Sequence, residues 1–508
     1  MALFRTHTAA VYGIDACPID VEVDMYSSGS ARDFVVVGMP DTAVRESRER
    51  IKSALMNGGF GYPNKAVTIN LAPANVRKEG AGFDLPMAVG ILGAMGLAAS
   101  TDEYLFVGEL SLDGGVRAVR GVLPMAVCAR RQGIANLVVP RANAAEASVV
   151  EGVRVFGVRH VAEAVSLVKQ PERFTPQPAA SAAPAHGASE GAAPDFAEVR
   201  GQTAAKRALE VAAGGGHNVL MIGPPGSGKT MLARRLAGIL PPLSFEEALE
   251  TTKVHSVAGV LAPGAGLLAV RPFRAPHHTI SDAGLIGGGA GTPRPGEVSL
   301  AHNGVLFLDE LPEFPRNVLE LLRQPLEEGS VTLARAQMTL AFPARFMLVA
   351  AMNPCPCGFH GDAMRECRCT GAIIQRYLGK ISGPLLDRID LHIEVPAVPY
   401  QELRSRGAGA TSAEIRERVG RARALQAARG FHNALIPQRR LRELCALDEA
   451  GERTLEMAVR RMGLSARAHD RILKVARTIA DLAGSENVQA RHVAEAVQYR
   501  SLDRNYWA

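Results

Sequence analysis

The sequence predicts an α/β protein built on a parallel sheet, with a smaller α+β domain before it and a helical domain after it. Three observations predict this class. A buried strand predicted at 217–222 leads through a glycine-rich turn into a helical pattern at 231–240, which is the strand–loop–helix order of a parallel sheet. A second apolar run, Val305–Leu308, ends in two acids, as buried parallel strands do at a ligand-binding edge. Residues 396–508 carry mostly helical patterns, including a broad apolar stripe at 471–482.

Length and composition divide the chain into three domains and a linker. At about 100–200 residues per domain, a chain of 508 residues allows three. Residues 171–194 are rich in proline, alanine, serine and glycine, a composition that cannot bury a core and predicts a flexible linker. We therefore expect an α+β domain at 1–170, a parallel-sheet core at 195–395 and a helical domain, or lid, at 396–508.

The N-terminal domain is expected to mix short strands with helices. Apolar segments at 34–37, 66–71, 104–107 and 136–139 predict strands, and helical patterns occupy 41–56 and 123–132.

Composition favours a cytoplasmic protein without a membrane partner. The chain has no apolar run long enough to span a bilayer, and its first residues lack the charged and apolar regions of a secretion signal. The net charge of +6 is mildly basic. It permits a nucleic-acid partner but does not require one.

A phosphate-binding loop is the most specific pattern in the chain. Its glycines let backbone N–H groups converge on one anion, a lysine reaches the β- and γ-phosphates, and a hydroxyl ligates Mg²⁺. The loop predicts ATP and Mg²⁺ as ligands, and its residues are Gly223, Pro224, Pro225, Gly226, Ser227, Gly228, Lys229 and Thr230.

Polar residues at the ends of three later segments complete a hydrolytic site. Asp309 and Glu310 follow the second apolar run, and we expect Asp309 to hold Mg²⁺ and Glu310 to polarise the attacking water. Asn353 follows a strand predicted at 346–351, where it could orient that water; the alternative is an asparagine in a turn before proline. Arg388 stands between apolar residues, which fits an arginine supplied to a neighbouring subunit's γ-phosphate. The alternative for Arg388 is a salt bridge with Asp387 or Asp390.

Four cysteines crowd into fifteen residues after Asn353. Such a cluster is typical of a tetrahedral Zn²⁺ site. The alternative is a set of reduced thiols that shapes the loop, and His360 is a competing ligand. The cysteines are Cys355, Cys357, Cys367 and Cys369.

These motifs, in this order, resemble those of AAA+ ATPases, and the chain is most similar to the magnesium-chelatase-like branch and its ComM/YifB family. The similarity rests on the segments 271–278, 293–304, 353–358 and 476–482 and covers the chain apart from the linker. It implies that Lys229 and Thr230 belong to Walker A, Asp309 and Glu310 to Walker B, and Asn353 to sensor 1. It also implies that Arg388 is the arginine finger and Arg467 the sensor 2 arginine. Lys380 departs from the pattern, since arginine is expected there, but keeps the charge.

The resemblance also implies a function. It implies a homohexameric ring with nucleotide at the subunit interfaces, and ATP-driven movement of DNA as a helicase or branch-migration factor in homologous recombination and natural transformation. Two insertions, at 275–296 and at a hairpin predicted for 330–342, project into the pore of related ring motors. Arg335 at the predicted hairpin tip would then touch a DNA phosphate, with an exposed turn arginine as the alternative.

Residues 74–134 resemble the proteolytic domain of Lon proteases, whose fold is like that of ribosomal protein S5. Lon proteases use a Ser–Lys pair, but the corresponding positions here are Gly82 and Leu123. We therefore expect a non-proteolytic domain. A protein-remodelling machine and a metal-chelatase motor remain as alternative functions.

Overall fold

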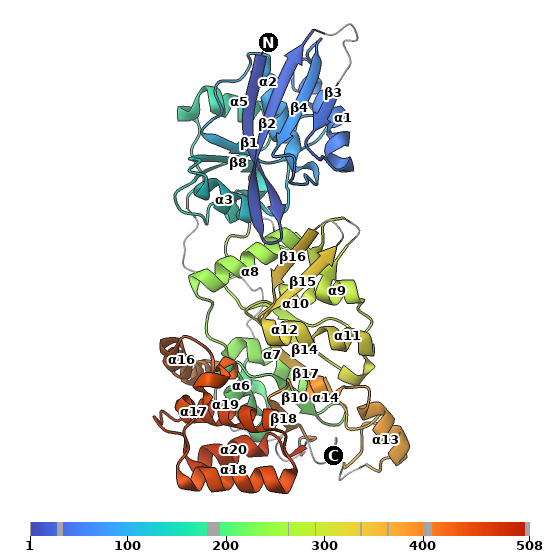
Figure 1. Cartoon of the computed structure of the whole chain (residues 1–508), viewed down its shortest axis with the longest axis vertical. Coiled ribbons are helices and arrows are strands. Elements are labelled where there is room, and N and C mark those ends of the chain that lie inside the picture. Colours follow the sequence, from blue (N-terminus) through green and yellow to red (C-terminus); the bar gives the residue numbers. More distant parts are fainter. Residues whose placement is uncertain are drawn as a thin grey trace.

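The computed structural model describes residues 2–27, 34–179, 194–262, 264–289, 291–335, 338–362, 365–399, 402 and 409–502. It confirms the α/β class, because a parallel sheet and a helical C-terminal region follow a separate mixed sheet. The two sheets form two blocks that succeed one another along the longest axis of the molecule (Figure 1). Residues 180–193, which fall in the expected linker, lie outside the described residues.

A seven-stranded mixed sheet forms the N-terminal block, in the order β3-β4-β2-β1-β5-β8-β9. Its strands are β1 (Ala2–Tyr12), β2 (Asp15–Tyr26), β3 (Phe34–Val37), β4 (Ala66–Ala72), β5 (Tyr104–Phe106), β8 (Asn136–Pro140) and β9 (Arg154–Val158). A short ladder joins β6 (Glu109–Leu110) to β7 (Val116–Arg117). The helices are α1 (Thr42–Asn57), α2 (Asp84–Ala94), α3 (Val122–Arg131), α4 (Ala144–Ala147) and α5 (Val161–Lys169).

The four strands predicted from short apolar runs are present, but the two longest strands were not predicted. β1 and β2 pair antiparallel along their whole length. In β2, buried Ile19, Val21 and Val23 alternate with acids at 20, 22 and 24. This period-two pattern marks a half-buried strand, and a search for continuous apolar runs passes over it.

Five parallel strands form the second sheet, in the order β11-β14-β17-β10-β18. They are β10 (Val219–Ile222), β11 (Phe273–Arg274), β14 (Val305–Leu308), β17 (Met347–Met352) and β18 (Leu391–Glu394). Every residue of β10, β14 and β17 is buried, as expected for parallel strands with helices on both faces. Because the strands are parallel, all loops after them gather at one edge, the carboxyl edge, and all loops before them gather at the other, the amino edge.

Helices and two small hairpins surround this sheet. The helices are α6 (Thr203–Gly215), α7 (Lys229–Ile239), α8 (Phe245–Ala258), α9 (Asp282–Ile286), α10 (Glu297–Leu300), α11 (Arg316–Leu321), α12 (Arg323–Glu328), α13 (Gly371–Leu378) and α14 (Gly383–Leu386). The first insertion contains β12 (Gly287–Gly288) and β13 (Arg294–Pro295), and the second is the hairpin β15 (Ser330–Arg335) and β16 (Met338–Pro343). Arg335 is the last residue of β15 rather than a turn residue, and the connecting residues 336–337 lie outside the described ranges.

The C-terminal region is helical and packs against α6 and the sheet. It contains α16 (Ser412–Arg429), α17 (Gln438–Leu444), α18 (Glu449–Met462), α19 (Ala466–Leu482) and α20 (Ala490–Gln498). Buried apolar residues of α16 and α19 share one core with those of α6, β10 and β18. A Ser465 cap on Ala468 N–H begins α19 one turn earlier than the predicted stripe.

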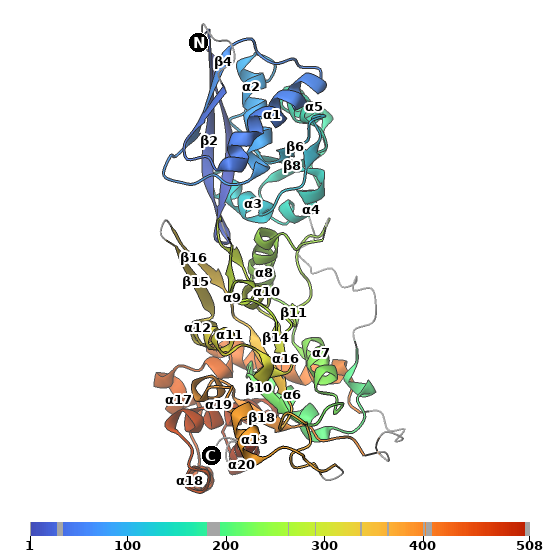
Figure 2. The same ribbon diagram turned by 90° about the vertical axis from the view of Figure 1, so that its right-hand side faces the viewer.

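The N-terminal domain rests on α8 and on both insertions. Lys253 of α8 pairs with Asp15 at 2.9 Å, and Ser256 donates to the buried carboxylate of Glu146 at 2.8 Å. The Tyr12 hydroxyl donates to the carbonyl of Thr339 on β16 at 3.3 Å. Thr292 N–H of the first insertion donates to Glu79 at 3.1 Å. Figure 2 shows the β15–β16 hairpin rising toward the tip of the β1–β2 hairpin.

Within the described residues, no helix combines the length and the apolar character needed to cross a membrane.

Candidate nucleotide-binding site

The phosphate-binding loop joins the buried strand β10 to the start of α7. Gly226 and Gly228 have φ angles of 76° and 94°, a left-handed conformation that glycine adopts without strain. The space beside Gly226 is open, since a Cβ built there meets no atom within 4 Å. The loop therefore has the backbone and the room that a polyphosphate needs.

Lys229 begins α7 and turns back over the loop. Its Nζ donates to the carbonyls of Gly223 at 2.7 Å and Pro224 at 2.9 Å, and to Asn353 Oδ1 at 3.2 Å. Burial lowers the pKa of Lys229, and the carboxylate of Asp309 opposes that shift. All three acceptors are uncharged, so the cation fits an incoming phosphate.

Two oxygen ligands for Mg²⁺ stand next to this lysine. Asp309 follows β14, and its Oδ2 accepts a hydrogen bond from the Thr230 hydroxyl at 2.7 Å. A carboxylate and a hydroxyl are ligands that Mg²⁺ uses together with substrate phosphates. Thr230 and Asp309 are 79 residues apart in sequence, and the parallel sheet brings them together at its carboxyl edge.

Glu310 lies beside Asp309 in a turn. Its φ of 53° is left-handed, which is uncommon for a non-glycine residue, and its side chain is exposed. His278 Nδ1 lies 3.5 Å from Glu310 Oε2, and the His278 ring lies edge-on to Phe314. We did not predict a contact to His278, although it lies in the segment 271–278 that carries the resemblance.

Arg388 occupies the opposite edge of the same sheet. It lies between α14 and β18, and its backbone carbonyl accepts from Asn218 Nδ2 at 2.9 Å. Asn218 precedes β10 and Gly223 follows it, a separation of about 16 Å at roughly 3.3 Å per residue. Arg388 is therefore far from Lys229 of its own chain.

The alternative predicted for Arg388, a salt bridge with Asp387 or Asp390, is not the pairing observed. Arg388 donates instead to the exposed Glu327 and to the carbonyl of Pro384. Its Nε is buried and has no hydrogen-bond partner in the described part of the chain.

Arg467 also lies at the amino edge. Its side chain is 69% exposed, and Nη1 lies 3.5 Å from Asp387 Oδ2. A depression of about 220 Å³ contains both predicted arginines. Its charged lining consists of four cations, Arg388, Arg467, Arg471 and Lys474, and three acids, Glu327, Asp387 and Asp470. The amino edge thus presents a hollow with a small excess of positive charge, here called the cationic hollow, whereas the carboxyl edge presents the phosphate loop.

A buried polar network beneath this hollow joins the start of β10 to helix α19 of the C-terminal region. Asp390 accepts from the Asn218 backbone N–H at 3.1 Å, contacts His217 Nδ1 at 3.3 Å and pairs with Arg471 of α19. Burial opposes ionisation of Asp390, but Arg471 and His217 hold its pKa well below the usual range. His217 Nε2 in turn contacts the Thr478 hydroxyl of α19 at 2.7 Å.

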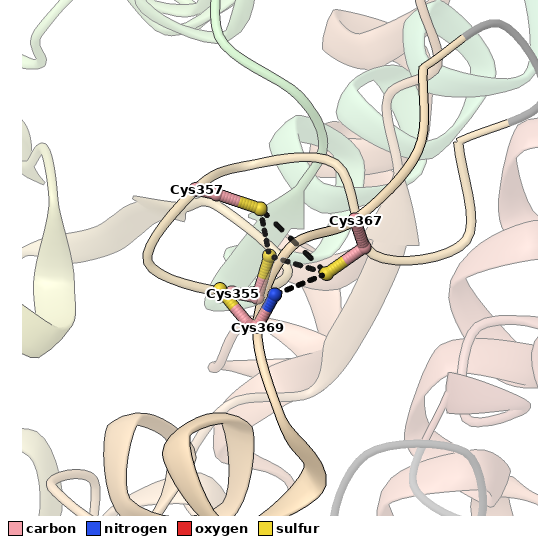
Figure 3. Close-up of side chains that lie close together, drawn as sticks. All are labelled: Cys355, Cys357, Cys367 and Cys369. Carbon is pink, nitrogen blue, oxygen red and sulfur yellow. Dashed lines mark hydrogen bonds between the residues drawn. The ribbon is translucent and has the colours of Figure 1, made fainter.

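The four cysteines converge, as predicted (Figure 3). Their sulfurs all lie within 4.8 Å of one another. The Sγ–Sγ distances are 3.3 Å for Cys355–Cys357, 3.7 Å for Cys355–Cys367 and 3.6 Å for Cys357–Cys367. Four convergent thiols are a donor set that suits Zn²⁺. His360 is not part of the converging group found among the described residues.

The Lon-like positions of the N-terminal domain hold no catalytic pair. A Cβ built on Gly82 meets only the side chains of Val107 and Val119, at 3.9 and 3.8 Å. Leu123 is fully buried in an apolar cluster. Neither residue supplies a nucleophile or a base.

The fold and the site define the class: a magnesium-chelatase-like AAA+ protein, a class that suggests an ATPase. Residues 195–403 match the family described as magnesium chelatase, subunit ChlI. Residues 21–143 match subunit ChlI of Mg-chelatase, and residues 409–500 match its C-terminal region.

Relatives of similar length identify the family within this class to which the chain belongs. It is 44% identical over 508 residues to competence protein ComM of Haemophilus influenzae, covering 99% of this chain and 98% of that protein. The YifB protein of Salmonella typhimurium has the same identity and coverage. The magnesium-chelatase 38 kDa subunit of Rhodobacter capsulatus is 29% identical over 31% of this chain and 50% of its own length. The chain belongs to the ComM/YifB family of magnesium-chelatase-like proteins.

Proposed function

We propose that this protein is a ring-forming ATPase that uses ATP hydrolysis to move DNA, as a helicase or branch-migration factor in homologous recombination and natural transformation. The link to transformation rests on the name of the competence relative. The proposed cofactors are ATP and Mg²⁺ at the phosphate loop and Zn²⁺ at the four cysteines. The proposed partners are DNA and further copies of the same chain, in a homohexamer.

The position of Arg388 carries the proposal. The Arg388 backbone is hydrogen-bonded to Asn218, and Asn218 is separated from Gly223 of the phosphate loop by about 16 Å along β10. This placement favours a role for Arg388 at a nucleotide held by the next subunit over one at its own. Its buried Nε has no partner in the described part of the chain, and its carboxylate partner, Glu327, is exposed. Both features suit a side chain that exchanges an ion pair for a neighbour's phosphate.

The same reasoning extends to Arg467. It shares the cationic hollow with Arg388, so we propose that both arginines act on the neighbouring subunit's nucleotide. The catalytic groups supplied by the first subunit are Lys229, Thr230, Asp309, Glu310 and Asn353. When bound, Mg²⁺ supplies charge neutralisation between the phosphates, and Glu310 takes the proton from the attacking water.

The two insertions favour DNA as the substrate on which the proposed motor acts. Arg335 is exposed at the end of β15 and donates to the Gly289 carbonyl of the first insertion at 2.6 Å. The two insertions are therefore joined through a cation that a phosphate could compete for. A chelatase motor is the weaker alternative, because similarity to the Rhodobacter subunit covers 31% of the chain.

ATPase stimulation tests the proposal. We expect four-way or forked DNA to raise ATP hydrolysis by full-length protein, while an unfolded protein and a porphyrin leave it unchanged. Arg335→Ala should reduce DNA stimulation and spare basal hydrolysis, whereas Arg131→Ala, at an exposed position on α3, should change neither. Stimulation by the unfolded protein alone would favour the protein-remodelling alternative.

A further inference from the structure

The four-cysteine loop begins directly at the nucleotide site. Asn353, whose Oδ1 accepts from Lys229 Nζ at 3.2 Å, is two residues before Cys355. Cys355 is fully buried in the apolar core beneath this edge of the sheet, and the other three cysteines are partly exposed. The loop ends two residues after Cys369, where α13 begins. A group that holds these sulfurs together therefore holds the chain between Asn353 and α13.

The spacing of the sulfurs fits a metal better than a disulfide. Four sulfurs about 2.3 Å from one Zn²⁺ lie about 3.8 Å apart at the corners of a tetrahedron. Three of the six separations, 3.3, 3.6 and 3.7 Å, approach that value, and all four sulfurs lie within 4.8 Å of one another. A disulfide needs about 2.05 Å. The shortest of these pairs, Cys355–Cys357 at 3.3 Å, would need to widen by about 0.5 Å to reach the tetrahedral spacing.

The same loop also presses on the phosphate-binding loop. Gly358 has a φ of 86°, and a Cβ built on it lies 2.5 Å from Pro225 Cδ. The Gly358 N–H donates to the Cys355 carbonyl at 2.9 Å, so this contact is one turn from the first sulfur. Asn353 and Gly358 thus touch the nucleotide site at two points, Lys229 and Pro225, on either side of Cys355.

We infer that the four thiolates bind one Zn²⁺ and that the ion braces the nucleotide site, by holding Asn353 against Lys229 and Gly358 against Pro225. The inference rests on the proposed ATPase function but is independent of DNA. Zinc is the brace and takes no part in hydrolysis: the site is a closed four-sulfur set. Loss of the ion releases both contacts and lowers the rate of hydrolysis.

Metal analysis tests the binding step. Full-length protein purified under reducing conditions without chelator should contain about one zinc per chain. The double variant Cys367→Ser/Cys369→Ser should lose most of it, and Cys17→Ser, in the N-terminal domain, should keep it. In case the double variant does not fold, a mercurial titration of wild-type protein gives a second measurement. Zinc release and loss of basal hydrolysis should then run in parallel, and excess thiol with Zn²⁺ should restore both.

Two glycines of the loop test the brace itself. Gly358→Ala places a methyl group against Pro225, and we expect basal hydrolysis to fall about tenfold with zinc content unchanged. Gly361→Ala is the matched control, because its φ of 78° is equally left-handed but a Cβ there meets nothing within 4 Å. It should keep both zinc and hydrolysis near the wild-type values.

Three outcomes would overturn the inference. The first is wild-type protein with no zinc near one per chain. The second is zinc release that leaves basal hydrolysis intact. The third is equal hydrolysis by the two glycine variants. None of these measurements contains DNA, so a failure of DNA stimulation would count against the proposed function and leave the zinc brace standing.

Discussion

The two edges of the five-stranded sheet differ in what they hold and in how far each could be predicted. The carboxyl edge carries the phosphate loop, Asp309 and Asn353, which contact one another through Lys229 and Thr230. The amino edge carries Arg388 and Arg467, whose partners are Glu327 and Asp387. One edge is arranged to hold an anion and its metal, and the other carries arginines that are paired with acids.

Under the proposed function, the difference means that one chain contains two half sites. A parallel sheet places strand-end loops about 16 Å from strand-start loops across a strand such as β10. The proposal therefore requires the two halves to meet across an interface between copies. Each prediction below disturbs one edge and asks whether the other edge responds, beginning with the largest expected effect.

Arg388→Ala should have the largest effect. An arginine finger contributes about 10³-fold or more to hydrolysis, so we expect a loss of that order with nucleotide binding retained. Binding can be measured with a fluorescent ATP analogue and hydrolysis by phosphate release. Lost binding would place Arg388 in its own chain's site, against the separation of the edges.

Lys229→Ala should lower the rate of ATP hydrolysis by about 10²–10³-fold, because the Nζ cation that contacts the phosphates is lost. Lys169→Ala, at an exposed position in α5, is the control. Mixing Lys229→Ala with Arg388→Ala should restore part of the activity, since each variant supplies the half that the other lacks. Inactive mixtures, from subunits shown to exchange, would contradict a shared site.

Asp390→Asn tests the buried network beneath the amino edge, in which Asp390 pairs with Arg471. This substitution leaves the guanidinium of Arg471 without its carboxylate partner. Removing one charge of a buried pair lowers the free energy of unfolding by about 3 kcal/mol. The folded-state pKa of Asp390 is lowered, so the stability it provides is full above its unfolded pKa of about 4 and is lost as pH falls further. Chemical denaturation at several pH values should therefore show that the free energy of unfolding falls less steeply with decreasing pH in the variant than in the wild-type protein. Asp470→Asn, which removes a partly exposed carboxylate on α19, should change stability little.

Arg467→Ala should have the smallest effect, a loss of about tenfold in hydrolysis, the size expected for one charge-assisted hydrogen bond to phosphate. Its present partner Asp387 is weakly held at 3.5 Å, so stability should be unchanged. Mixing with Lys229→Ala should recover activity if Arg467 serves the neighbour. If Lys229→Ala restores activity when mixed with Arg388→Ala but not when mixed with Arg467→Ala, then only Arg388 acts on the neighbouring subunit's nucleotide.

The carboxyl edge could be predicted because its parts are local in sequence. Strand, loop and helix follow one another from 219 to 239, and Asp309 and Asn353 each follow a recognisable apolar strand. The same rule predicted the cysteine cluster, since all four thiols lie within fifteen residues. The fold class followed from these same short patterns.

The rest could not be predicted because it depends on contacts between distant segments. Arg388 meets Glu327 across 61 residues, and Asp390 meets His217 across 173. No local pattern specifies such pairs; packing of α14 and α19 against the sheet does. The β1–β2 hairpin was missed for a different reason, since the alternating acids of β2, together with Arg5 and His7 in β1, lower its average hydrophobicity.

The seating of the N-terminal domain has a mechanical consequence. The domain bears on α8 through Lys253 and Ser256, and on the two insertions through Tyr12 and Glu79. It extends away from α8 along the longest axis of the molecule (Figure 1), so its far end lies at the greatest distance from these contacts. If the domain turns together with α8, a rotation of a few degrees would displace that far end by the largest amount, so a fluorophore placed there would report small movements of α8.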